Sequence, residues 1–432
     1  MARRGPPFAR EPELVQCAGP CYDEAILIES GEIALRMSVY VHFPFCKSKC
    51  VYCDFCSFAA DGTAVERYCD SLAREMELAS AEYPGAEIAT VYFGGGTPSV
   101  VPAPLMRKVT RKLRECFSIL PDAEFTSEAN PGTVTDAWLD VMAEAGMNRL
   151  SIGVQAAQER LLRLLGRIHT FAQAADTLAM ARSHGIRNLS ADLMYGLPAQ
   201  TPDEYLASIR AVAGLGVRHI SAYALKVEEN TRLASMIERG ELALPDEDLA
   251  ADMMEAGIEL LEALGYRRYE ISNFANPGFE SRHNLVYWRQ GHYLGLGLNA
   301  AGMLPAAGTA YARRSNTASL PEYHRRIALG ELPAAETIPV SREEAMFETV
   351  MLGLRTVDGV GYREFEAMHG VKLQAAYADA IGELEARGCL KPADPTDPRL
   401  ALNTRGLALQ NSALMLFMEA NADTPGEKGL QK

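Results

Sequence analysis

The first 225 residues of the chain repeat one pattern of hydrophobic and polar positions. A short run of β-branched or aromatic residues is followed by a turn rich in glycine or polar residues, and then by a segment with the period of an amphipathic helix. Alternation of this kind predicts parallel strands with right-handed crossovers, in a barrel or a doubly wound sheet. The predicted strands are residues 38–43, 89–93, 124–129, 149–154, 188–197 and 219–225.

The polar residues that do not fit this pattern decide between the two architectures. They gather at the carboxyl ends of the predicted strands: cysteines after the first, Gly94–Thr97 after the second, then Glu128, Gln155 and Asp192. A doubly wound sheet concentrates such residues at one switch point, whereas a β/α barrel draws them from several strands. The sequence therefore predicts an α/β fold with a partial (β/α)6 barrel and one site at its rim.

The pattern changes after residue 226. Residues 227–340 extend the barrel with a long helix (246–265), a strand (266–274) and a glycine-rich stretch (292–304) whose flexible backbone suits a large planar ligand. Residues 341–420 contain three helices and a hairpin, which predicts a winged-helix-like domain acting as a lid or docking module. Residues 1–37 are expected to form a leader before the barrel core (38–226), and residues 421–432 a disordered tail.

Composition and charge narrow the class of protein. The chain has 432 residues and a formal net charge of −14, from 42 Lys plus Arg and 56 Asp plus Glu. This acidic balance argues against nucleic acid as a partner. No apolar run is long enough for a transmembrane segment, and the start of the chain lacks the apolar region of a secretory signal. We expect a cytoplasmic protein, with peripheral association with the membrane left open.

Four of the nine cysteines lie close together, in VHFPFCKSKCVYCDFCSF. In a reducing compartment such a cluster indicates a metal site. Cys46, Cys50 and Cys53 form a set of three thiolates for zinc or an iron–sulfur cluster, with one position left open. The alternative is a structural zinc site with Cys56 as fourth ligand, and Cys17 and Cys21 are two further thiols in the leader.

The cysteine motif and its flanks resemble the radical S-adenosylmethionine (SAM) superfamily. Further along the chain YFGGGTPS, SEANPG, RLSIGVQ, LGRIH, ADLMYGLP and HNLVYW occur in order. Together these motifs resemble the oxygen-independent coproporphyrinogen III oxidase family, and within it the HemW branch of heme chaperones. The resemblance runs from about Ser38 to the C-terminus.

The resemblance implies two cofactors and their binding residues. Cys46, Cys50 and Cys53 would bind a [4Fe–4S] cluster whose fourth iron is chelated by SAM. The positions that match SAM contacts of the family are Tyr40, Tyr52, Gly95, Gly96, Thr97, Glu128, Gln155, Arg167 and Asp192. One-electron reduction of the cluster, by a reductant such as a flavodoxin or ferredoxin, would then cleave SAM to methionine and a 5′-deoxyadenosyl radical.

Two departures from the oxidases favour the chaperone branch. The oxidases carry a fourth cysteine as CxC, whereas this chain has Cys56 one position too late. The segment from Arg282 to Trp288 also matches the HNxxYW element of the chaperones, which implies His283 as a heme iron ligand flanked by Tyr287 and Trp288. The length of the leader favours the oxidases instead, because they also have an N-terminal arm.

Three function classes follow from these observations. We predict a heme chaperone that binds a [4Fe–4S] cluster, SAM and heme, and passes the heme to an acceptor protein. The alternatives are a coproporphyrinogen III oxidase, which would use the same cofactors to decarboxylate its substrate, and a structural zinc protein. Whether the chain is an enzyme stays open at this point.

Overall fold

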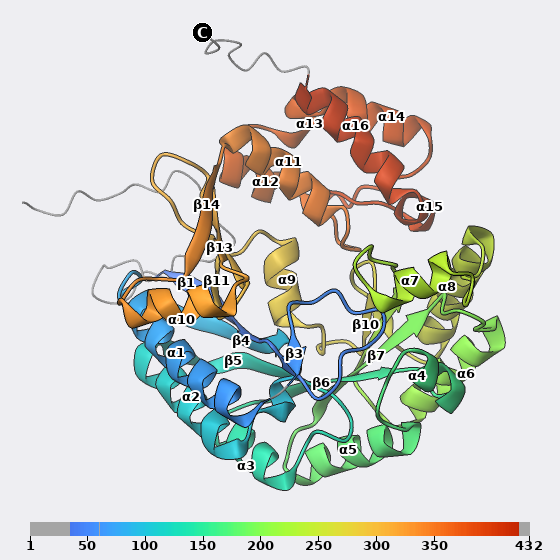
Figure 1. Cartoon of the computed structure of the whole chain (residues 1–432). Helices are drawn as coiled ribbons and strands as arrows, with labels where there is room; N and C mark the ends of the chain where they lie inside the picture. Colours follow the sequence, from blue (N-terminus) through green and yellow to red (C-terminus); the bar gives the residue numbers. More distant parts are fainter. Residues whose placement is uncertain (1–34, 60, 423–432) are drawn as a thin grey trace, which may run out of the picture.

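Six parallel strands follow one another in chain order across the centre of a curved sheet (Figure 1). The computed structural model describes residues 35–59 and 61–422. The six strands are β1 (Arg36–Phe43), β4 (Glu87–Gly95), β5 (Ser118–Ala129), β6 (Arg149–Gln155), β7 (Asn188–Tyr195) and β8 (His219–Ala224), and each pairs in parallel with the next. Each overlaps one of the six predicted strands.

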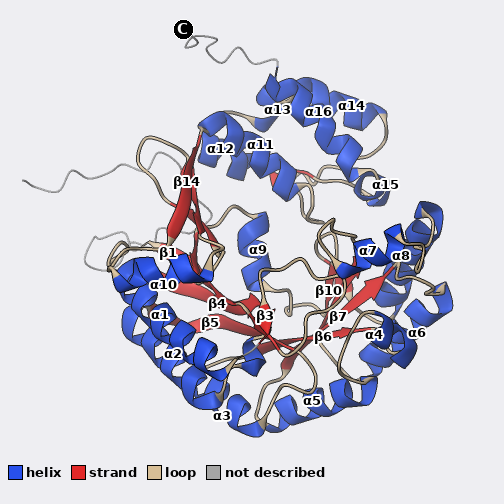
Figure 2. Cartoon of the chain, viewed as in Figure 1, coloured by secondary structure: helices blue, strands red, loops and turns tan. Residues whose placement is uncertain are grey.

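Helices cover the outer face of this sheet (Figure 2). They are α1 (Gly62–Ser80), α2 (Ala103–Cys116), α3 (Asp136–Glu144), α4 (Glu159–Leu164), α5 (Phe171–Ser183) and α6 (Pro202–Gly214). Capping boxes fix the starts of α5 and α6, where Thr170 pairs with Gln173 and Thr201 with Glu204. The apolar stripes of the helices bury the outward side chains of the strands, such as Val41 and Leu193, in the main core. The predicted partial barrel is confirmed.

The sheet continues beyond both ends of the barrel and has twelve strands in the described part of the chain. Next to β8 lie the antiparallel strands β10 (Asn273–Ala275) and β9 (Arg267–Arg268). Next to β1 lies the parallel strand β11 (Tyr293–Leu296), followed by the antiparallel strands β12 (Ala301–Leu304), β13 (Tyr311–Asn316) and β14 (Ala334–Val340). The glycine-rich stretch 292–304 therefore consists mainly of two strands with a turn at residues 297–300 between them, and our interpretation of it as flexible backbone was wrong.

Four helices accompany these extensions. They are α7 (Arg232–Glu238), α8 (Glu247–Ala263), α9 (Arg282–Trp288) and α10 (Leu320–Ala328). Of these, α8 corresponds to the predicted long helix, and α9 carries the HNxxYW element.

The C-terminal region is helical and has its own core. Its helices are α11 (Arg342–Gly353), α12 (Tyr362–His369), α13 (Leu373–Ala376), α14 (Ala378–Ala386), α15 (Thr404–Ala408) and α16 (Gln410–Ala422). They pack around Val350, Phe365, Leu384 and Phe417. One antiparallel pair, β15 (Val360–Gly361) with β16 (Arg399–Leu400), accompanies them. The helical character is confirmed, while the bounds of the predicted domains stay a prediction.

Some predictions concern residues beyond those described. The predicted leader, with Cys17 and Cys21, lies outside the described residues except for its last three positions, and most of the predicted tail does too. Within the described ranges, no helix combines the length and apolar character that crossing a membrane requires.

Candidate functional site

The three motif cysteines lie on a loop that leaves the carboxyl end of β1. Two short parallel strands, β2 (Phe45–Cys46) and β3 (Phe58–Ala59), close the base of this loop. Val51 fixes its middle, because its N–H donates to the carbonyl of Leu165 at 3.1 Å and its carbonyl accepts from the N–H of Leu233 at 2.8 Å. The thiols of Cys46, Cys50 and Cys53 are free and half-buried. The loop thus presents three thiols at the carboxyl edge of the sheet, as predicted.

Polar residues from other strand ends reach these thiols. The Thr97 hydroxyl lies 3.5 Å from Cys46 Sγ, and Arg167 Nη1 lies 3.4 Å from Cys50 Sγ. Asn130 joins the two, because its Nδ2 donates to Thr97 Oγ1 at 2.8 Å and its Oδ1 accepts from Arg167 Nη2 at 2.5 Å. A hydroxyl and a guanidinium are donors that stabilise thiolate sulfur. The chemistry of this set therefore fits an iron–sulfur cluster.

The two glycines of the predicted SAM set dock β4 against the cysteine loop. A Cβ on Gly96 would lie 2.6 Å from the carbonyl oxygen of Phe45, and one on Gly95, whose φ is +102°, would lie 2.3 Å from the ring of His42. Their N–H groups bond within the protein, Gly96 to the carbonyl of Phe43 and Gly95 to Glu128 Oε2. Close packing, rather than free backbone groups, thus explains these glycines.

Two carboxyl groups of the predicted SAM set lie inside the barrel. Glu128 Oε1 accepts from Tyr92 OH at 2.8 Å, and Asp192 Oδ1 accepts from Ser151 Oγ at 3.2 Å. Burial raises the pKa of Glu128 to about 7, with a further contribution from the charge of Asp192, and burial also raises the pKa of Asp192. Both side chains nevertheless keep some exposed surface. Because Glu128 and Asp192 lie inside the barrel and still have exposed surface, we infer that they line a hollow in its interior.

Other predicted SAM residues surround the same hollow. Tyr40 stacks on Tyr92 at 6.1 Å between ring centroids, and the Oε1 of Gln155 accepts from Tyr223 OH at 3.0 Å. Gln155 has a φ of +70°, a backbone conformation that is strained for a residue with a side chain. Tyr52 lies on the cysteine loop, and the charges of Cys50 and Cys53 add to burial in raising its pKa. The structure therefore places Thr97, Arg167 and Tyr52 beside the cysteines, and their role in binding SAM stays a prediction.

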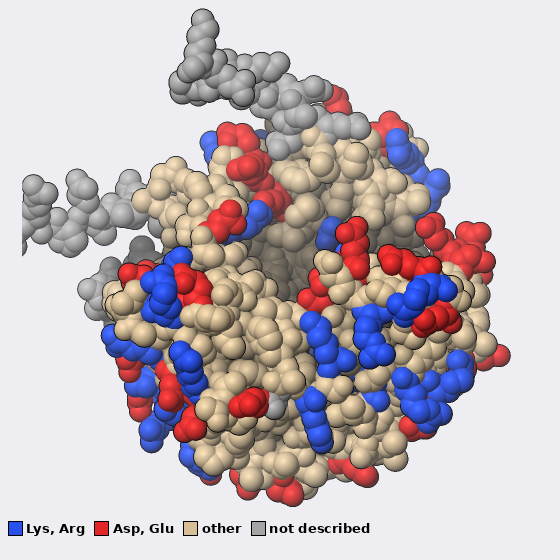
Figure 3. All heavy atoms as spheres, viewed as in Figure 1, with Lys and Arg blue, Asp and Glu red and all other residues tan. Residues whose placement is uncertain are grey.

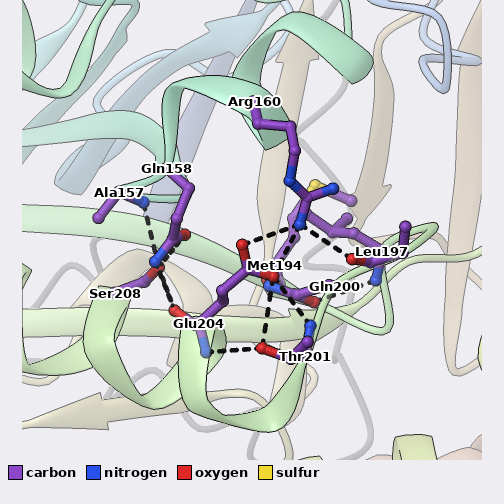
Figure 4. A network of polar contacts seen from close by, with 10 residues as sticks. Ala157, Gln158, Arg160, Met194, Leu197, Gln200, Thr201, Glu204 and Ser208 are labelled. Carbon is purple, nitrogen blue, oxygen red and sulfur yellow. Dashed lines mark hydrogen bonds and ion pairs between the residues drawn. The ribbon is translucent and has the colours of Figure 1, made fainter.

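A polar network joins the segment that follows β6 to helix α6 (Figure 4). Arg160 of α4 forms an ion pair with Glu204 of α6 at 2.8 Å and donates to the carbonyl of Ala199 at 2.9 Å. Gln158 Nε2 donates to the carbonyl of Glu204, and Ser208 accepts from the N–H of Ala157. These contacts join the turn after β6 to the first turns of α6.

The HNxxYW helix α9 lies against the barrel interior, and its histidine is fully buried. His283 Nδ1 lies 2.7 Å from Thr90 Oγ1, and Nε2 lies 2.8 Å from Tyr287 OH, while the ring stacks on Tyr92. Burial lowers the pKa of His283 to about 3. Both ring nitrogens are thus engaged, so iron ligation by His283 stays a prediction that requires one of these hydrogen bonds to break. Trp288 is half-buried and lines a small cavity beside α11 and β15.

One buried residue near the site escaped the sequence reasoning. Arg149, at the start of β6, is 2 % exposed, and its Nε has no hydrogen-bond partner among the described residues. Its positive charge opposes the effect of burial on the pKa of both Glu128 and Asp192. The available signal was its position two residues before Ser151 and four before Gly153, on the inward face of the strand.

The fourth cysteine of the motif region lies apart from this arrangement. Cys56 Sγ is 4.0 Å from the carbonyl oxygen of Ala318, and burial raises the pKa of its thiol. Within residues 35–59 and 61–422, no three Cys, His, Asp or Glu side chains converge so that they could hold one metal ion. A closed zinc site needs such convergence. A cluster distributes its thiolates over separate iron atoms and does not need it.

Comparisons with protein families agree with this geometry. The model of the radical SAM superfamily matches residues 40–212, and that of the HemN C-terminal domain matches residues 340–409. In overall fold the chain is similar to the coproporphyrinogen III oxidase HemN from Escherichia coli, a radical SAM enzyme. The TM-score is 0.76 at 23% sequence identity, over 89% of this chain and 90% of that chain.

Similar proteins of known name span nearly the whole chain. The heme chaperone HemW of Lactococcus lactis is 34% identical over 88% of this chain and 97% of its own length, and that of Bacillus subtilis is 34% identical over 88% and 99%. The Escherichia coli HemW is 41% identical over 62% of this chain and 70% of its own length. The resemblance inferred from the motifs is confirmed: the chain belongs to the HemW family of radical SAM proteins.

Proposed function

We propose that this chain is a heme chaperone, which binds heme and passes it to an acceptor protein. The observation that carries the proposal is the similarity to two relatives that are named heme chaperones. The similarity covers 97% of the length of one relative and 99% of the length of the other. The structural likeness to the oxidase concerns the fold and does not by itself favour decarboxylation.

Within this function, Cys46, Cys50 and Cys53 hold the [4Fe–4S] cluster that a radical SAM fold implies. Thr97 and Arg167 support this assignment, because they direct hydrogen-bond donors at Cys46 and Cys50. Cys56 stays outside the cluster, since its thiol lies beside Ala318. Together the bound cluster and SAM supply one-electron reduction and an adenosyl radical.

The residues around the hollow bind SAM. Glu128 and Asp192 are the groups that accept hydrogen bonds from an ammonium or from ribose hydroxyls, and Arg167 is the cation available to a carboxylate. The raised pKa of Glu128, at about 7, lets it hold a proton or a negative charge near neutral pH. Tyr40, Tyr52 and Gln155 complete the wall, while Gly95, Gly96 and Thr97 form the floor beside Cys46.

Heme binds beside α9, and ligation of its iron by His283 would require the hydrogen bond to Thr90 or to Tyr287 to break. Figure 3 shows the molecule hollowed between the C-terminal helices and the barrel, where Figure 1 draws α9, with few charged residues inside the hollow. His283, Tyr287 and Trp288 are the heme residues that we predicted from the sequence. The partners are heme, an acceptor protein and a reductant such as a flavodoxin or ferredoxin, and we place the protein in the cytoplasm.

The test is anaerobic incubation of the iron- and sulfide-reconstituted protein with SAM and reductant, and with either coproporphyrinogen III or heme. We expect one tightly bound heme per chain and no protoporphyrinogen IX. Formation of protoporphyrinogen IX at many turnovers would favour the oxidase, and a colourless zinc-containing protein would favour the zinc alternative.

A further inference from the structure

A cavity of about 940 Å³ lies between the sheet extension and the C-terminal helices, away from the cysteines. The turn between β12 and β13 forms one wall, and the first turn of α11 and the end of α12 form the other. Most of its lining is small or apolar, including Pro305, Ala306, Ala310, Ala345 and Met368. Its volume is in the range of pockets that hold cofactors, and the small side chains leave room for a flat ligand.

His369 provides a metal-binding group in this wall. Its Nε2 lies 2.8 Å from Thr349 Oγ1, and its Nδ1 has no partner among the described residues. The Thr349 hydroxyl carries one proton and also lies within hydrogen-bond distance of two oxygens, Gln290 Oε1 and the carbonyl of Ala345. If the Thr349 hydroxyl donates its proton to one of these oxygens, it can only accept a hydrogen bond from His369. The proton of the His369 ring then lies on Nε2, and Nδ1 keeps a free lone pair. Imidazoles that bind metals are usually oriented by such a bond at the other nitrogen.

The same wall is connected to the HNxxYW helix. Gln290, two residues after the end of α9, has a φ of +54° and accepts the hydrogen bond from Thr349. Two residues later His292, which is 4 % exposed, also lines the cavity, and its buried Nδ1 has no hydrogen-bond partner within the part of the chain that the structure describes. A ligand in this cavity is therefore in contact with residues directly following α9 in the chain.

We propose that the one heme of the chaperone lies in this cavity, with His369 in place of the hydrogen-bonded His283 as an axial ligand of the iron and Arg342 at the rim as partner of a propionate. This rests on the proposed function, which makes heme the ligand that the protein must hold. The occupant is argued from three features together: the volume, the small apolar walls, and an imidazole oriented by Thr349. Arg342 is exposed and already donates to the carbonyl of His369, so its charge lies beside the predicted ligand.

The experiment is titration of the full-length chain with hemin and, separately, with metal-free protoporphyrin IX, followed by absorbance. Ala306→Trp fills the cavity, and Ala335→Trp, on an exposed position of β14 outside the lining, is its matched control. His369→Gln removes the imidazole but keeps a side chain that can bond to Thr349.

We expect Ala306→Trp to lower the affinity for hemin and for protoporphyrin IX at least tenfold, and Ala335→Trp to change neither affinity. His369→Gln should shift the Soret band of bound hemin and lower the affinity for hemin severalfold. The affinity for protoporphyrin IX should be unchanged. Tight hemin binding that is unchanged in Ala306→Trp and His369→Gln would overturn this site and leave the chaperone function standing. No hemin binding by the wild-type chain would instead overturn the chaperone function itself.

Discussion

At the scale of single residues, the cysteine loop separates thiols that the sequence places side by side. Burial raises the pKa of the Cys53 thiol, and the charges of the neighbouring Cys50 and Cys46 raise it further. Cys56, three residues later, lies beside Ala318 instead. Proximity in the sequence therefore does not make a common ligand set.

This difference gives a direct prediction. Cys53→Ser should abolish cluster reconstitution, because the cluster would lose one of three protein ligands, whereas Cys56→Ser should bind iron as the wild type does. The two variants are compared after anaerobic reconstitution by their iron and sulfide content and by their absorbance near 400 nm. Loss of iron in Cys56→Ser would show that the fourth cysteine is a ligand after all.

Glu128 should make stability depend on pH. Burial raises its pKa from 4.5 to about 7, so between these values the folded chain holds a proton that the unfolded chain has released. Stability therefore falls as pH rises through this window. Glu128→Gln removes the ionisation, and from pH 5 to pH 7.5 the free energy of unfolding of the wild type should fall by about 2 kcal/mol relative to the variant.

Urea unfolding of the cluster-free chain at both pH values measures this difference. Glu75 is buried with a pKa also near 7, but it is present in both proteins and so does not affect the comparison. Parallel pH profiles for wild type and Glu128→Gln would contradict the assignment of the proton to Glu128.

Several features of the site could be predicted from residues alone, and others could not. The cysteines and the carboxyls were visible because such groups at strand ends rarely serve packing. Arg149 was not, because an arginine at the start of a strand usually faces solvent. Nor could the sequence show that both nitrogens of His283 bond to Thr90 and Tyr287, since Thr90 is far away along the chain.

At the scale of elements, the sheet extension shows how a glycine can be misinterpreted. We interpreted residues 292–304 as flexible because glycine leaves the backbone free to adopt many conformations. In the structure Gly295 pairs with Tyr40 on one side, and a Cβ on it would lie 2.0 Å from the carbonyl oxygen of Ala301. The glycine is there because another backbone passes close by, and sequence periodicity carries no information on that distance.

Gly295→Ala should therefore destabilise the protein strongly. The colliding atom belongs to backbone that cannot rotate away, so we expect a loss of more than about 3 kcal/mol in the free energy of unfolding. Gly382→Ala is the control: it lies inside α14, no described residue would contact its added Cβ within 4 Å, and the change should be neutral or stabilising by up to about 1 kcal/mol. Equal stabilities of the two variants in urea unfolding would contradict the close pairing.

At the scale of the whole molecule, the protein has two hydrophobic cores, and each supports a different binding site. Among the described residues, the buried members of the main core end at Ile327, and the second core is built from residues between Val350 and Phe417. A small cluster that includes Tyr311 and Ala345 joins them. The cysteines and the barrel hollow belong to the first part, and one wall of the 940 Å³ cavity belongs to the second.

Removing the C-terminal region should separate the two binding activities. A chain that ends at Val340 keeps the main core, so its iron and sulfide content after reconstitution should equal that of the full chain. Its affinity for hemin should fall at least tenfold, because Ala345, Met368 and His369 are absent. Unchanged hemin affinity in this shortened chain, with its helical content checked by circular dichroism, would place heme entirely within the barrel.

The position of β11 also sets the order in which the protein can fold during synthesis. Strands β1, β4, β5, β6, β7 and β8 pair in the order in which a ribosome makes them, but the outer edge of β1 pairs with Tyr293–Leu296. Until those residues emerge, a hydrophobic edge strand remains open on the nascent chain, and such edges recruit other chains. Pairing across so long a stretch of sequence is also slow. Refolding should therefore be limited by the docking of β11, and chaperones that shield strand edges should raise its yield.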